Sequence, residues 1–84
     1  MNEYEHIVEF SFNPRPEKFV VRFLDGKSYV LEVSALPKKM QTKKPAWKDA
    51  YLSVSKDAIV TTAGNGKEVR EIPAFIIHAK GKEV

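Results

Sequence analysis

The 84-residue chain has no cysteine, which excludes disulfide bonds and cysteine-based zinc clusters. It also lacks a long apolar run. Its longest unbroken aliphatic and aromatic stretch, residues 74–77, is far shorter than the roughly 20 residues of a membrane-spanning helix. Residues 1–5 are acidic, whereas a secretory signal begins basic and continues apolar. These absences predict a single cytoplasmic domain over residues 1–84 with no membrane association.

Catalytic and metal-binding motifs are absent as well. His6 and His78 are too far apart in sequence for a His-x-x-x-His metal pair, and no Gly-x-Ser-x-Gly segment occurs. The Gly64–Lys67 segment does not match a phosphate-binding loop, because Thr61 stands at the first glycine position and Glu68 follows the lysine. We interpret residues 64–66 as a hairpin turn. The sequence therefore predicts neither an enzyme nor a bound metal or cofactor.

Period-two alternation of apolar residues dominates the first half of the chain. Val8, Phe10 and Phe12 alternate with polar residues and predict a half-buried strand over residues 6–12, which ends at a turn over residues 13–16. We expect further strands at residues 51–54, 58–63 and 67–72. The predicted fold is mainly β, a small antiparallel meander or barrel-like sheet of five to seven strands with one or two short helical turns. An α+β fold is the alternative.

A hairpin over residues 19–33 is indicated by two alternating segments around Asp25-Gly26. A three-residue loop, Leu24-Asp25-Gly26, is favoured because it gathers the apolar residues on one face and places Gly26 at a left-handed bulge position. A two-residue turn would mix polar and apolar side chains on each face. The favoured register pairs Phe19 with Leu31, Val21 with Tyr29 and Phe23 with Lys27.

The end of the chain permits two interpretations. Ile76-Ile77 favours a strand, whereas Pro73 and Gly81 flank residues 74–80 as a first-turn proline and a terminating glycine flank a helix. We favour the strand. Residues 81–84 are predicted to form a flexible tail.

Basic residues are concentrated in one segment. The net charge is +3, yet residues 38–48 contain five lysines and no acid, and the rest of the chain is slightly acidic. We predict an exposed lysine-rich loop over residues 35–45, and a short helical turn from Pro45 that places Trp47 and Tyr51 on one side. The candidate binding residues are Lys38, Lys39, Lys43, Lys44, Trp47 and Lys48.

This segment suggests two alternatives. The lysines could neutralise phosphates while the indole of Trp47 stacks on an unpaired base, as in small β domains that bind single strands. Alternatively, the lysines only keep the protein in solution and Trp47 closes one end of the core. The same charge also suits an acidic protein partner.

Exposed strand edges support a different class of function. An edge strand can pair with a strand from a second copy or from another protein. We therefore favour a non-enzymatic module for protein interaction or self-association, with nucleic-acid binding as the alternative. Four charged residues could instead protect the strand edges: Arg15, Lys18, Arg22 and Glu32.

Phe23-Leu24-Asp25-Gly26, followed by the alternating residues 29–33, resembles a family of short bacterial proteins of unassigned function. These proteins have a strand ending in Phe-x-Asp-Gly and a second alternating strand within a small α+β domain. Some are encoded beside toxin–antitoxin or other regulatory genes. The resemblance covers residues 19–34. It implies an accessory, non-enzymatic role and no catalytic residue. Members tend to carry a tryptophan late in the chain, whereas the only one here is Trp47.

Overall fold

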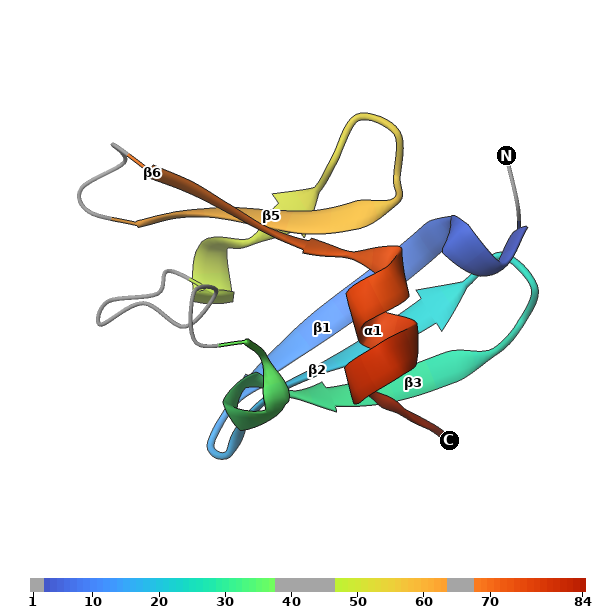
Figure 1. Ribbon diagram of the computed structural model, residues 1–84, viewed down its shortest axis with the longest axis horizontal. Helices are drawn as coiled ribbons and strands as arrows, with labels where there is room; N and C mark the ends of the chain where they lie inside the picture. The colour runs from blue at the N-terminus through green and yellow to red at the C-terminus, as the bar shows by residue number, and fades with distance from the viewer. Residues whose placement is uncertain (1–2, 38–46, 64–67) are drawn as a thin grey trace.

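The computed structural model describes residues 3–37, 47–63 and 68–84, which form two antiparallel sheets and one α-helix (Figure 1). The first sheet, sheet A, has the order β1-β2-β3-β7, with strands Ile7–Pro14, Glu17–Phe23, Ser28–Glu32 and Lys82–Glu83. The second sheet, sheet B, has the order β4-β5-β6, with strands Tyr51–Leu52, Ala58–Ala63 and Glu68–Pro73. Helix α1 spans Ala74–Lys80, and short 3-10 turns are η1 (Glu3–Glu5), η2 (Val33–Ala35) and η4 (Trp47–Asp49). The predicted mainly β fold is confirmed, with its strands divided between two sheets.

The register of the β2–β3 hairpin follows the prediction. Phe19 pairs with Leu31 and Val21 with Tyr29, and the N–H of Phe23 donates to the carbonyl oxygen of Lys27 at 2.9 Å. Gly26 has a φ of +91°, the left-handed conformation that favours glycine. The three-residue loop is therefore confirmed.

Strand β1 differs from the prediction at its first residues. A β-bulge between Ile7 and Glu9 shifts the register, so that Ile7 pairs with Phe23 and is fully buried. Val8, predicted to share the core face with Phe10 and Phe12, is instead 36% exposed. The bulge adds one residue to β1 and so turns Val8 away from the core.

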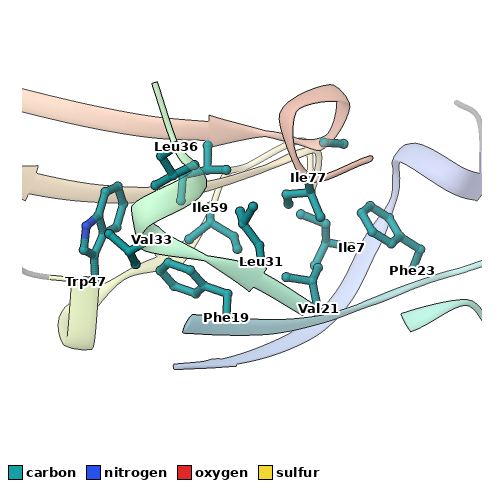
Figure 2. Packing of buried hydrophobic residues seen from close by; sticks show 12 residues of the cluster. Ile7, Phe19, Val21, Phe23, Leu31, Val33, Leu36, Trp47, Ile59 and Ile77 are labelled. Carbon is teal, nitrogen blue, oxygen red and sulfur yellow. The ribbon is translucent and has the colours of Figure 1, made fainter. Parts of the chain in front are cut away.

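The core lies between the two sheets. Figure 2 shows Phe19, Val21 and Leu31 of sheet A below Ile59 of sheet B, with Ile77 of α1 beside them. All five of these side chains are fully buried. Burying an aliphatic or aromatic side chain of this size contributes about 1.5–3 kcal/mol. This packing holds the two sheets and α1 together.

The end of the chain is a helix followed by a strand, so the favoured strand over residues 74–80 is wrong. Within α1, Ala74 and Ile77 lie one turn apart and are buried, whereas Phe75 is exposed. Pro73 and Gly81, which flank α1, therefore indicated the structure of this segment better than the strand preference of Ile76-Ile77 did. Residues 82 and 83, predicted to belong to a flexible tail, form β7 and pair with Val30 and Tyr29 of β3.

Candidate partner-binding edge

Strand β1 forms one edge of sheet A, and β2 and β3 lie inside it. The other edge is covered because β7 pairs with β3. Lys18, Arg22 and Glu32 therefore stand on interior strands and do not protect a sheet edge, in contrast to one of the sequence hypotheses. Within sheet A, the strand left available for pairing is therefore β1; in sheet B, β6 is also an edge strand.

The backbone groups of β1 that face outward can be assigned from the hydrogen bonds of β2. Leu24 donates its N–H toward the β1 side, to the carbonyl of His6, whereas Phe23 donates toward β3. The backbone groups of successive residues point alternately to the two sides of a strand, so the N–H and C=O groups of Arg22 and Val20 point toward β1. Their partners on β1 are Glu9 and Ser11, whose backbone groups therefore face β2. The backbone groups of Phe10, between these two residues, and of Phe12, after Ser11, face the free edge.

Phe10 and Phe12 consequently present an N–H and a C=O each along the free edge. Neither residue makes a backbone hydrogen bond outside the β1–β2 pairing to any residue of the described ranges 3–37, 47–63 and 68–84. At one end of the edge, the N–H of Ile7 donates to the carbonyl of Lys56 at 2.7 Å. At the other end, Pro14 has no N–H to offer. The free edge therefore covers the segment between the bulge and Pro14.

A hollow of about 380 Å³, the inner hollow, lies beside this edge on the core side of sheet A. Its lining residues are Phe10, Ser11, Phe12, Pro14, Trp47, Lys48 and Ala50. The rings of Phe10 and Phe12 are half-buried against Phe19, with ring centroids 6.1 and 5.0 Å away. Trp47 contacts Phe19 edge-on at 5.6 Å. This aromatic packing gives the inner hollow an apolar wall next to unpaired backbone groups.

A second hollow of about 440 Å³, the outer hollow, lies on the opposite face of sheet A. Its lining residues are Glu9, Phe10, Ser11, Val20, Arg22 and Ser28. Glu9 and Arg22 form an ion pair with a 3.1 Å N–O distance across β1 and β2. The two faces of the free edge therefore differ in chemistry: one is aromatic, and the other is mostly polar with a neutralised charge pair.

Of the sequence-predicted site residues, the structure describes Trp47 and Lys48, one buried and the other exposed. Trp47 is only 1% exposed and packs in the core, so its indole is not available to stack on a base. Its burial matches the alternative in which Trp47 closes one end of the core. Lys48 is exposed at the inner hollow. Tyr51 is 54% exposed and does not share the buried side with Trp47. Lys38, Lys39, Lys43 and Lys44 lie outside the described residues, so phosphate binding by the lysines stays a prediction.

His78 belongs to an aromatic cluster on the β3 side of the molecule. Its ring stacks on Phe23 with centroids 4.5 Å apart and meets Tyr29 edge-on at 4.6 Å. Nε2 of His78 lies 2.5 Å from the carbonyl oxygen of Tyr4. Because a carbonyl can only accept, Nε2 carries the proton in this contact. The histidine is half-buried and joins η1 to α1, so these contacts give it a role in holding the fold together.

The described part of the chain contains no group of three histidine, cysteine, aspartate or glutamate side chains able to hold a metal ion. None of its helices is long and apolar enough to cross a membrane. The residues that sequence reasoning missed are Phe10 and Phe12, which it assigned only to the core. Their signal was available in part, since both belong to a strand followed by two prolines.

Comparisons with known proteins add nothing to this geometry: no family model, no curated protein and no solved structure matches the chain. The resemblance of residues 19–34 to a family of short bacterial proteins therefore stays a prediction.

Proposed function

We propose that this chain is a small non-enzymatic protein-binding module that adds an extended segment of a protein to the free edge of β1. The observation that carries the proposal is that the backbone N–H and C=O groups of Phe10 and Phe12 face the free edge, with a hollow on each face of the strand. In strand addition, backbone hydrogen bonds supply affinity and pockets for alternate side chains supply specificity.

The two hollows define the chemistry of the bound segment. Side chains of an added strand alternate between the two faces of the sheet. Those on the inner side would contact the half-buried rings of Phe10 and Phe12, which favours apolar residues. Those on the outer side would lie near Ser11 and the Glu9–Arg22 ion pair, which favours polar residues. The expected partner is therefore an extended segment with alternating apolar and polar side chains.

Trp47, which borders the inner hollow, carries an unpaired donor that is relevant to the same proposal. The indole Nε1 of Trp47 is buried and has no hydrogen-bond partner within the described ranges. A buried donor without a partner costs about 1–3 kcal/mol. A carbonyl or hydroxyl group of a bound segment that reaches Nε1 would remove this cost.

The test is amide hydrogen exchange with peptide probes. Ten-residue peptides selected from a displayed random library against the immobilised protein would be added to the labelled protein. Strand addition predicts slower exchange at the N–H groups of Phe10 and Phe12, which face the edge, and unchanged exchange at Ser11, which faces β2. Gly26, in a distant turn, is the second control. Peptides that bind without slowing exchange at Phe10 and Phe12 would contradict the proposal.

A further inference from the structure

We infer that the partner of the β1 edge is a second copy of this chain, which makes the protein a symmetric homodimer. The inference rests on the proposed function, because it uses the same free edge. It is carried by the local symmetry of the sequence: Phe10 and Phe12 flank Ser11 on both sides, and both phenylalanines have outward-facing backbone groups.

A twofold axis at Ser11 satisfies every backbone group of this short edge. Two antiparallel β1 strands would then place Phe10 opposite the second copy's Phe12, and the reverse. Each of these two pairs exchanges an N–H···O=C bond in both directions. The Ser11 residues would face each other on the axis as a pair without hydrogen bonds. An interface of this kind is isologous, the commonest form in soluble oligomers.

The same register agrees with the side chains. On the inner face, Phe10 of one copy lies beside Phe12 of the other, and cross-strand aromatic pairs contribute about 0.2–1 kcal/mol each. On the outer face, Glu9 lies opposite the second copy's Asn13, so no like charges meet. Glu9 is already neutralised by Arg22. The charges therefore allow self-pairing.

The ends of the free edge fix this register and exclude longer pairing. Before Phe10, the bulge disturbs the ladder, and the N–H of Ile7 is used by the carbonyl of Lys56. After Phe12, Pro14 has no N–H. A register shifted by two residues in either direction would set a Phe10 or Phe12 backbone opposite one of these interrupted positions. The register centred on Ser11 uses both phenylalanines fully.

The first experiment uses the absence of cysteine. In Ser11→Cys, the only two thiols of the dimer would face each other across the axis, with Cα atoms about 4.5 Å apart. This separation lies within the range that disulfides accept. Mild oxidation should give a covalent dimer of about twice the 9.6 kDa chain mass. Asn13→Cys is the matched control: it stands on the same strand and face, but its two copies would be about 13 Å apart and should stay unlinked.

The second experiment measures the dimer without cross-linking. Sedimentation equilibrium should show a monomer–dimer equilibrium, and Ser11→Asp should raise its dissociation constant about tenfold, because two carboxylates would meet on the axis. Ser34→Asp, in η2 and outside the lining of both hollows, should leave that constant unchanged. Exchange at Phe10 and Phe12 should slow as protein concentration rises.

The outcomes separate this inference from the proposed function. A strict monomer whose Ser11→Cys variant stays unlinked overturns the dimer, whereas peptide binding that protects Phe10 and Phe12 in that monomer keeps the proposed function. Equal linking of Ser11→Cys and Asn13→Cys overturns the register. Protection of Phe10 and Phe12 at every concentration, with no peptide added, would mean that the chain covers its own edge, and it overturns both.

Discussion

The two edges of sheet A differ in what covers them. On the β3 side, β7 pairs with Tyr29 and Val30, and the N–H of Val84 donates to the carbonyl of Ser28 at 2.9 Å. Figure 1 shows α1 beside that edge and leading into β7. On the β1 side, no strand of the described residues pairs with the outer edge of β1, whose inner edge pairs with β2. One edge is covered by β7 of the same chain, and the other keeps its hydrogen-bonding groups unpaired within the described residues.

The difference shows how one sheet of a small β domain can restrict strand pairing to one of its edges. Unpaired edges invite pairing with other chains, and proteins limit them with bulges, prolines and covering segments. Here β7 covers one edge, while the bulge and Pro14 shorten the other. The few residues that remain have one self-complementary register. A short edge of this kind favours a defined dimer over open-ended aggregation.

The largest expected effect concerns the packing of Trp47 against Phe19, beside the free edge. Trp47→Ala removes a fully packed indole from beside Phe19, and such substitutions cost about 3–5 kcal/mol of unfolding free energy. Urea denaturation would measure the loss, and amide exchange should rise more in β1 than in β3. The exposed Lys48→Ala is the control and should change stability by less than about 0.5 kcal/mol. A loss below about 1 kcal/mol for Trp47→Ala would mean that the indole does not support the edge.

The next prediction disturbs the covered edge. A Cβ on Gly81 would lie 2.5 Å from the carbonyl oxygen of Ile77 and 3.2 Å from that of Val30. Because both contacts are with backbone, Gly81→Ala must shift α1 or β7, and overpacking of this kind costs about 1–3 kcal/mol. Thermal unfolding would measure the cost, and exchange should rise at the N–H of Val30, which faces β7, and stay unchanged at that of Tyr29, which faces β2. Lys82→Ala is the control. Unchanged exchange at Val30 would show that β7 tolerates the shift.

The smallest effect concerns the outer face of the free edge. The Glu9–Arg22 ion pair is exposed on both sides, and exposed pairs contribute about 0.2–1 kcal/mol. A double-mutant cycle with Glu9→Ala and Arg22→Ala should give a coupling energy in this range, and about 1 M salt should remove most of it. A coupling energy that survives such salt would require a contribution other than exposed charge attraction.

Local patterns were sufficient where neighbouring residues determine the structure. The Asp25-Gly26 turn and the alternation around it predicted the β2–β3 register, because only one loop length keeps the apolar residues on one face. The bulge in β1 was missed because Ile7 and Val8 are both apolar, and either could begin the inward phase. The choice depends on Phe23 and Lys56, which are distant in sequence.

The remaining errors have the same origin. The β-branched pair Ile76-Ile77 suggested a strand, yet the packing of Ala74 and Ile77 against the core stabilises a helix of only seven residues. Such a helix is too short to show its own periodicity. Trp47 stands among lysines, and its burial is decided by Phe19, far along the chain. The free edge could not be located from sequence because it depends on which strand β7 joins.

The contact between His78 and Tyr4 joins residues 74 positions apart. Contacts at such a separation require the closure of a long loop, whereas the β1–β2 and β2–β3 hairpins close over a few residues. We therefore expect the three hairpin strands to pair while the end of the chain is still unfolded, and during synthesis before it has been made. In that interval both edges of the three-stranded sheet, β1 and β3, are open to other chains. Residues 82 and 83 then cover the β3 side of sheet A, and among the described residues of this sheet only the β1 side stays open to another chain.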